Sequence, residues 1–174
     1  MIDIVPLDPA VYAGREYEAE VVSERFLAIA RTAKGFSLRW EQAEEPIRRP
    51  MRDQMLAPWL EEPLGFGAFD GGDLLGFGEG FLEKWNNRFR VTNIAVFDRA
   101  NRRRGVGSLL MERLLAEARS RGARMAVLET QTFNAPAVAF YEKHGFSLIG
   151  FDLYAYSNEG PAERNVRLEM GRAL

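Results

Sequence analysis

One junction between a strand and a helix constrains this sequence more than any other feature. Residues 88–96 alternate like a β-strand, and a polar loop follows at residues 97–104. From Gly105 onward, apolar residues recur every three to four positions until Gly122, which predicts an amphipathic helix. The strand and the helix together indicate a chain that combines both kinds of element.

The segments around this junction predict one mixed domain. Two alternating runs, residues 64–69 and 74–82, flank Asp70-Gly71-Gly72-Asp73, which is typical of a β-hairpin. Further along we expect a strand at 125–129, a helix capped by Asn134 and ended by Gly145, and strands at 146–156 and 165–170. This order favours a single α/β or α+β domain around a mixed sheet.

The first 63 residues give weaker signals. Residues 2–5 predict a short strand, residues 17–33 fit either a strand or a helix, and residues 36–42 alternate like a strand. The segment EEPIRRP, with Pro46 and Pro50, is expected to break that strand. A short helix is expected to follow at residues 51–60.

Composition excludes several classes of function. The 23 Lys and Arg against 25 Asp and Glu give a net charge of −2, so overall charge does not attract nucleic acid or anionic membranes. There is no cysteine, and His144 is the single histidine, which disfavours a metal site or a His-dependent triad. Neither a signal peptide nor a membrane-spanning run is visible, so we expect a cytoplasmic protein without a metal.

The loop before the amphipathic helix has the composition of an anion-binding site. A helix N-terminus offers unpaired N–H groups and partial positive charge, glycine allows close backbone approach, and arginine binds phosphate oxygens. The residues concerned are Arg102, Arg103, Arg104, Gly105, Val106, Gly107 and Ser108, with Arg99 nearby. The alternatives are a solvated basic loop and an RNA-binding patch.

A second cluster lies further along, from Asn134 through Tyr141 to Phe146. Together, R-x-x-G-x-G, N-x-x-A-x-x-F-Y and G-F resemble the GNAT superfamily of acetyl-CoA-dependent N-acetyltransferases, over about residues 74–170. The resemblance implies a mixed, mostly antiparallel central sheet flanked by helices and splayed between two strands around the acetyl-CoA site. It implies a single domain over 1–174, with a variable acceptor-side region at 1–63 and an acetyl-CoA-binding core at 64–174.

The resemblance also implies which residues meet acetyl-CoA. The strand residues Ile94, Ala95 and Val96 would pair with the pantetheine arm, and the amides of residues 103–108 would hold the pyrophosphate. Asn134 would bind the pantetheine or hold the splayed strands, although a helix cap alone explains it. Ala137 would leave room for the cofactor. Tyr141 would protonate the departing thiolate, although an aromatic residue beside Phe140 is also typical of a core.

An acceptor amine must lose a proton before it attacks, and a carboxylate can take that proton. In many relatives an acidic residue lies just before the segment matching Ile94, but here Thr92 and Asn93 stand there. The candidates for a proton acceptor are Glu129, then Glu83, then Glu79. Each of these carboxylates has the alternative of a solvent-facing or cross-strand charge.

Three stretches resemble the streptothricin acetyltransferase branch of the superfamily: residues 128–131, Trp85-Asn86 and residues 150–158. The resemblance implies direct acetyl transfer, in a ternary complex, to a primary amine of a small cationic substrate, a streptothricin-like antibiotic or a polyamine. Acidic and aromatic side chains suit a cation. The substrate-binding candidates are Trp85, Glu79, Asp152 and Tyr154, with Tyr156, although the two tyrosines alternate like half-buried strand residues.

Three other functions stay open. The chain could acetylate a protein N-terminus or lysine, bind acyl-CoA without turnover, or bind nucleic acid through its arginines. We expect a small-molecule amine as the partner, neither nucleic acid nor membrane, and a homodimer as an alternative to the monomer because exposed strand edges invite pairing.

Overall fold

The computed structural model describes residues 1–98, 101 and 104–174. The chain folds into two compact units. The first comprises Met1–Ala19, Met51–Leu128 and Arg172–Leu174, and the second comprises Glu20–Pro50 and Glu129–Gly171. Arg102 and Arg103, two of the expected phosphate ligands, lie outside the described residues, as does Arg99. Within the described part of the chain, no helix has the length and apolar character needed to cross a membrane.

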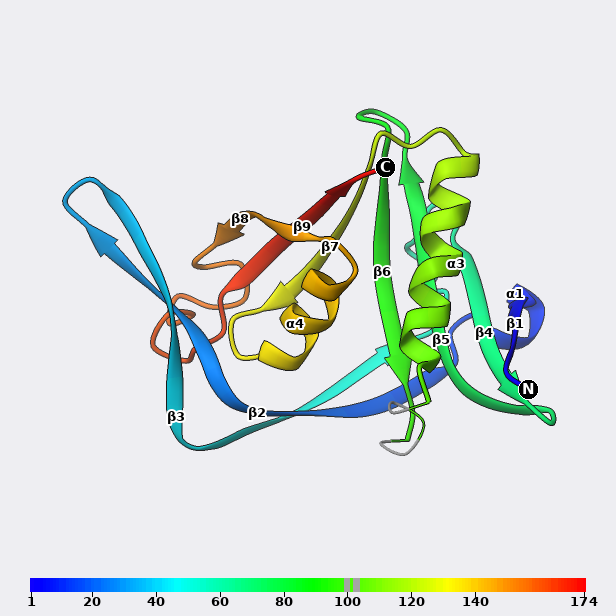
Figure 1. Ribbon diagram of the computed structural model, residues 1–174, viewed down its shortest axis with the longest axis horizontal. Coiled ribbons are helices and arrows are strands. Elements are labelled where there is room, and N and C mark those ends of the chain that lie inside the picture. Colours follow the sequence, from blue (N-terminus) through cyan, green and yellow to red (C-terminus); the bar gives the residue numbers. More distant parts are fainter. Residues whose placement is uncertain (99–100, 102–103) are drawn as a thin grey trace. The chain divides into compact units, whose positions relative to one another are not determined.

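A twisted sheet forms the body of the first unit, in the strand order β1-β4-β5-β6-β7. Neighbouring strands are antiparallel, except that β6 and β7 are parallel. Helix α3 runs alongside the sheet and contacts β4, β5 and β6 (Figure 1). The elements are β1 (Asp3–Pro6), α1 (Pro9–Tyr12), β4 (Leu64–Asp70), β5 (Asp73–Glu83), β6 (Arg88–Val96), α3 (Val106–Ser120) and β7 (Met125–Gln131), of which residues 125–128 belong to this unit.

The structure confirms the predicted hairpin between β4 and β5. Asp70 pairs with Asp73, and the two residues between them, Gly71 and Gly72, have φ angles of +60° and +98°. Such angles are strained for other residues, so the two glycines allow a two-residue turn whose twist matches that of the strands.

The predicted apolar stripe of α3 faces the sheet. Its buried residues are Val106, Leu110, Met111, Leu114, Leu115 and Ala118. Leu109, on the neighbouring row of the helix, is 38% exposed. On β5, a Cβ added at Gly78 would lie 2.9 Å from Leu114 Cδ1, so this glycine lets the helix approach the strand closely.

The second unit combines a two-stranded ribbon with strands and one helix from the end of the chain (Figure 1). The ribbon pairs β2 (Glu16–Thr32) with β3 (Gly35–Gln54), whose outer ends, residues 16–19 and 51–54, belong to the first unit. Residues 129–131 of β7, helix α4 (Ala135–Lys143), β8 (Ser147–Asp152) and β9 (Arg167–Ala173) complete the unit, with β8 and β9 antiparallel.

The ribbon corrects two predictions. We expected EEPIRRP to break the strand and residues 51–60 to form a helix, but β3 continues through Pro46 and Pro50 to Gln54, and turns follow it. Proline lacks an N–H, so it breaks a central strand. In a two-stranded ribbon each strand has a free edge, and proline is tolerated where its nitrogen faces that edge.

The C-terminal predictions hold only in part. The side-chain oxygen of Asn134 accepts a hydrogen bond from the Ala137 N–H and caps α4 as expected. The predicted strand at 146–156 was too long, because β8 ends at Asp152, where the side chain accepts a hydrogen bond from Tyr154 N–H and starts a turn. Tyr154 and Tyr156 therefore do not alternate on a strand.

Candidate functional site

The N-terminus of α3 has the geometry of an anion-binding site. Gly105 is its N-cap, with a φ angle of +79° and no capping side chain. A Cβ added there would meet no described atom within 4 Å. Val106, Gly107 and Ser108 form the first turn of the helix. This turn can accept a phosphate group.

Arg104, the described arginine of the loop, already has an anionic partner. One of its nitrogens lies 2.5 Å from Asp70 Oδ2, and another donates to Asn101 Oδ1 at 3.2 Å. The hydrogen bond from Arg104, together with the N-terminal ammonium group, lowers the pKa of Asp70. A bound phosphate would therefore share or replace the Asp70 contact.

Ile94, Ala95 and Val96 form the last part of β6, where they pair with Gly78, Phe77 and Gly76 of β5. The parallel register between β6 and β7 runs only from Arg88↔Met125 to Val91↔Leu128. The end of β6 therefore continues beyond that ladder, with one backbone edge available for an added strand-like ligand.

The strand pair β5 and β6 contains a β-bulge immediately before this segment. Glu79 pairs with Asn93 and Gly80 pairs with Val91, so Thr92 is an extra residue on β6. Thr92 Oγ1 lies 3.4 Å and Asn93 Nδ2 lies 2.8 Å from Glu79 Oε1. Successive side chains of a regular strand point to opposite faces, so the bulge is what brings both to one carboxylate.

Glu79 is fully buried, with 0% of its surface exposed. It is the one charged residue in the buried core of the described chain. Its other oxygen, Oε2, accepts a hydrogen bond from Leu56 N–H at 2.6 Å. The pKa of Glu79 is raised, mainly because burial disfavours the charged carboxylate. The negative charge of Asp53 also raises this pKa, whereas the hydrogen bonds from Asn93 and Leu56 lower it.

Asn93 connects Glu79 to two residues of the ribbon ends. Its Nδ2 group also donates to Asp53 Oδ2 at 3.3 Å, and its Oδ1 atom accepts from the Tyr17 hydroxyl at 2.9 Å. Asn93 was not a candidate from the sequence because an amide is not a base. Asp53 and Tyr17 carried no sequence signal either, since only the folded ribbon brings them to β6.

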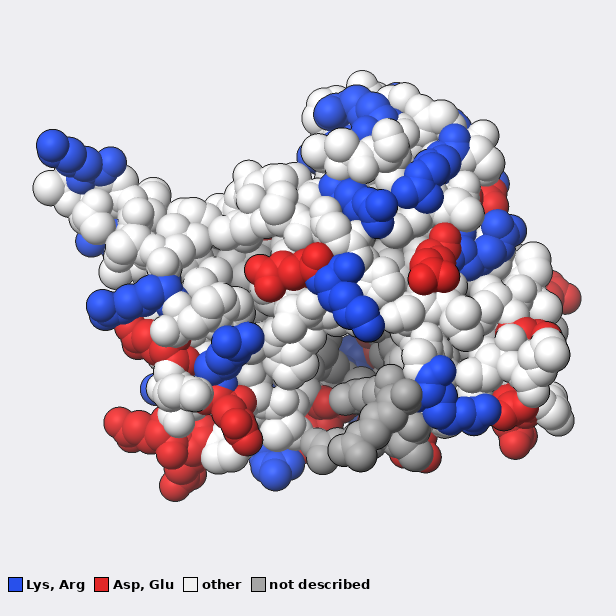
Figure 2. All heavy atoms as spheres, viewed as in Figure 1, with Lys and Arg blue, Asp and Glu red and all other residues white. Residues whose placement is uncertain are grey.

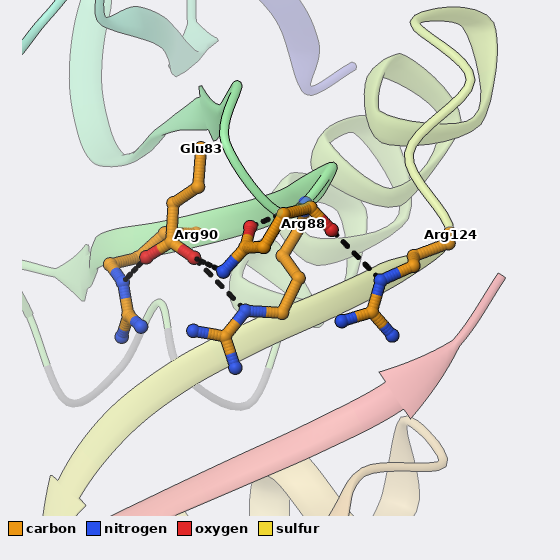
Figure 3. A network of polar contacts seen from close by, with 5 residues as sticks. Glu83, Arg88, Arg90 and Arg124 are labelled. Atoms are coloured by element: carbon orange, nitrogen blue, oxygen red, sulfur yellow. Dashed lines mark hydrogen bonds and ion pairs between the residues drawn. The ribbon is translucent and has the colours of Figure 1, made fainter.

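Glu83 lies at the far end of the same strand, in a different environment. Its carboxylate lies 3.0 Å from Arg88 Nε and 2.5 Å from Arg90 Nε (Figure 3). Asn86 Nδ2 donates to it as well, at 3.0 Å. Burial raises the pKa of Glu83, but these hydrogen bonds and the charge of Arg90 outweigh that effect and lower it. The arrangement stabilises the end of the hairpin.

Trp85 occupies the turn between β5 and β6 and is 85% exposed. This turn is at the start of β6, whereas Ile94 is near its end. Ile94 lies six positions after Arg88, which is about 20 Å at the usual rise of a strand. The first unit therefore does not bring Trp85 or Glu83 near the expected pantetheine segment.

In the second unit, helix α4 and its N-cap carry three of the predicted residues, Asn134, Ala137 and Tyr141. Tyr141 is half-buried between the rings of Phe140 and Phe146, at centroid distances of 5.5 Å and 6.2 Å. Burial raises the pKa of Tyr141 to about 12, so the phenol stays protonated at neutral pH. Its hydroxyl makes no hydrogen bond to any described residue. Asn134 uses its oxygen for the cap, and its amide nitrogen has no described partner.

The second unit also gathers several predicted acceptor-side residues around Arg167. The guanidinium lies 3.9 Å from Glu129 Oε2 and 3.6 Å from Asp152 Oδ2. The Tyr156 hydroxyl donates to Glu129 Oε1 at 2.5 Å, and Gln131 Nε2 lies 3.3 Å from that hydroxyl. Arg167 was not among the residues predicted from the sequence. Tyr154 is connected to this cluster only through its backbone bond to Asp152.

Charge is distributed without a dominant sign. On the face shown in Figure 2, Lys and Arg side chains lie among Asp and Glu side chains rather than forming one basic field. Among residues 1–98, 101 and 104–174, no group of three or more His, Asp or Glu side chains is arranged to hold a metal ion.

Comparison with known proteins fits this geometry. Residues 33–146 match the model of the acetyltransferase (GNAT) family. Streptothricin acetyltransferase from Streptomyces lavendulae is 32% identical over 133 residues, 72% of this chain and 70% of that protein. Streptothricin acetyltransferase from Escherichia coli is 38% identical over 96 residues, 55% of this chain and 54% of its own.

A solved structure of nourseothricin acetyltransferase is 27% identical, with a TM-score of 0.78 over 99% of this chain and 98% of that one. This similarity confirms the predicted mixed α+β fold with a mostly antiparallel central sheet. The family uses acetyl-CoA as its acetyl donor. The chain therefore belongs to the acetyltransferase (GNAT) family and is an acyltransferase.

Proposed function

We propose that this protein transfers the acetyl group of acetyl-CoA to a primary amine of a small cationic antibiotic of the streptothricin class. The observation that carries the proposal is the match to the nourseothricin acetyltransferase structure over 99% of this chain. Streptothricin acetyltransferases from two organisms match 72% and 55% of this chain. A polyamine is the second acceptor class that the same chemistry allows.

The residues present suit acetyl-CoA. The helix N-terminus at Gly105, with the amides of Val106, Gly107 and Ser108, would bind the pyrophosphate, and Arg104 would exchange Asp70 for a phosphate oxygen. The edge of Ile94, Ala95 and Val96 would pair with the pantetheine arm. The amide nitrogen of Asn134 would hydrogen-bond that arm, while Ala137 beside it adds little bulk. Acetyl-CoA supplies a thioester carbonyl.

Tyr141 would protonate the sulfur that leaves. A phenol whose pKa is raised to about 12 keeps its proton until a strong base, such as a thiolate, develops beside it. The free hydroxyl supports this role, since no described residue competes for its proton. Tyr141→Phe removes only the hydroxyl, and we expect turnover to fall about 100-fold while the Kd for acetyl-CoA stays within a factor of two.

The cluster around Arg167 would receive the cationic acceptor. Glu129 and Asp152 are each about 40–50% exposed and supply negative charge, and Tyr154 and Tyr156 offer aromatic faces to a cation. Glu129 is the first candidate for the proton acceptor on the sequence pattern. Because both its oxygens already have partners, we assign it first to holding the substrate.

The test is thiol release from acetyl-CoA with streptothricin, spermidine, lysine and a peptide with a free N-terminal alanine. We expect release with streptothricin and an acetylated antibiotic by mass spectrometry. Release with the peptide alone would instead favour a protein acetyltransferase. Cofactor binding by calorimetry without release from any amine would indicate an acyl-CoA-binding module. Parallel runs with Tyr141→Phe separate enzymatic release from background thioester hydrolysis.

A further inference from the structure

The first unit holds two neighbouring carboxylates with no cation beside them among the described residues. Other acidic side chains of this unit form ion pairs: Glu83 with Arg88 and Arg90, Glu18 with Arg52, and Asp70 with Arg104. Glu79 and Asp53 pair with no Lys or Arg among the described residues, although they share one amide group, Asn93 Nδ2. A buried carboxylate without a counter-ion is costly, so its retention suggests a task.

The two carboxylates differ in access. Glu79 is fully buried, and all its described partners are neutral donors, Asn93, Thr92 and the Leu56 N–H group. Asp53 is exposed, and its Oδ1 atom accepts only from the neighbouring Gln54 N–H. A substrate can therefore touch Asp53 but not Glu79.

The position of the pair is set by the bulge on β6. Asn93 stands directly before Ile94, the residue at which the expected pantetheine segment begins. Three strands meet at its side chain: β5 supplies Glu79, β3 supplies Asp53 and β2 supplies Tyr17. Among the described residues, these three are the titratable side chains that hydrogen-bond to Asn93. Arg52, next to Asp53 in the chain, is paired with Glu18.

We infer that Asp53 accepts the proton of the acceptor ammonium group and that Glu79 is a positioning residue that holds Asp53 through Asn93. This deepens the proposed function and rests on it. The ammonium nitrogen gives one proton to Asp53, the neutral nitrogen forms a bond to the thioester carbonyl carbon, and the carbon–sulfur bond breaks. Asp53 then releases its proton to the solvent. Tyr141 gives its proton to the departing thiolate and is restored by the second proton that the nitrogen loses.

Glu79 adds two things to this arrangement. Its carboxylate fixes one N–H of the Asn93 amide, so the other N–H points at Asp53. Its negative charge attracts the ammonium group together with that of Asp53. Glu79 also holds the Leu56 amide, where φ is +45°, so a variant of Glu79 changes folding as well as chemistry. Asp53 is exposed, so a substitution there tests the proton transfer with less effect on folding.

The experiment compares Asp53→Asn with wild type by steady-state kinetics from pH 6 to pH 10, with an amine that the wild type acetylates. We expect kcat/KM for the amine to fall about 100-fold at neutral pH, with the KM for acetyl-CoA within a factor of two. The loss should shrink as the pH approaches the pKa of the amine, about 10.4 for a lysine-like group, because the neutral amine then needs no acceptor. Glu79→Gln should show the same recovery with pH.

Glu18→Gln is the matched control, since it removes a carboxylate from the same ribbon end without touching Asn93. Its pH profile should match that of wild type. Full activity of Asp53→Asn at neutral pH, or a loss that does not recover at high pH, would overturn the inference while leaving the proposed function intact. A wild-type protein silent on every amine would overturn the proposed function and this inference with it.

Discussion

Two glutamates on one strand, Glu79 and Glu83, show how far environment decides what a carboxylate does. Both lie on β5, four residues apart, and a regular strand places them on the same face. Glu83 sits between two arginines at the hairpin end, and its pKa is lowered. Glu79 sits in the bulge among neutral donors, and its pKa is raised. Glu83 therefore suits a structural ion pair, whereas Glu79 suits the positioning role inferred for it.

Removing the side-chain amide of Asn93, which connects Glu79 to Asp53, should have the largest effect on stability. Asn93→Leu removes the hydrogen bond that Asn93 donates to Glu79. It also removes the oxygen that accepts a hydrogen bond from the Tyr17 hydroxyl. We expect a loss of about 3 kcal/mol in the free energy of unfolding, measured by urea denaturation, since buried polar groups are left short of partners.

Thr92→Val is its matched control. Thr92 Oγ1 is 3.4 Å from the same Glu79 oxygen, a marginal hydrogen bond, so about 0.5 kcal/mol is expected from the loss of a weak contact. Equal losses for the two variants would contradict the central place given to Asn93.

The opposite pKa directions predict opposite pH dependences of stability. Glu79, with a raised pKa, binds its proton more tightly in the folded state, so the free energy of unfolding falls as the pH rises above about 4.3. Glu83, with a lowered pKa, stabilises the fold above that pH and loses this contribution as the pH falls below it.

Denaturation of Glu79→Gln and Glu83→Gln between pH 3 and pH 8 measures both effects. Relative to wild type, Glu79→Gln should gain stability as the pH rises, and Glu83→Gln should lose up to about 1 kcal/mol, the scale of a partly exposed ion pair. If the stability of both variants relative to wild type changed with pH in the same direction, the contrast between the two glutamates would be wrong.

The smallest effect is expected where both partners are exposed. Arg52 and Glu18 form an ion pair on the ribbon, with 71% and 69% of their side chains exposed. Solvent screens such a pair, so Arg52→Gln should change the free energy of unfolding by less than about 0.5 kcal/mol, as followed by thermal melting at two salt concentrations. A larger loss that does not depend on salt would show that burial does not explain the difference in stabilisation between the Glu83 ion pairs and this exposed pair.

The parts of the fold with strong local patterns could be predicted from the sequence. The hairpin around Gly71-Gly72, strand β6 and helix α3 each carry a turn signal or a clear period, and the structure reproduces them. The ribbon could not be predicted in the same way, because Pro46 and Pro50 are read as breaks unless the strand is known to have a free edge. The resemblance itself rests on two motifs at junctions that local patterns define.

The family of this protein can be recognised from the chain alone, since Gly105, Gly107 and the cap at Asn134 encode local geometry that needs no distant partner. Which carboxylates have a cation beside them depends on the complete fold. Asp53 and Asn93 are 40 residues apart and meet because β3 and β6 fold together, and one extra residue at Thr92 turns neighbouring side chains to the same acid. Strand register and burial decide which groups surround a carboxylate and therefore in which direction its pKa shifts. Both depend on residues far apart in the chain.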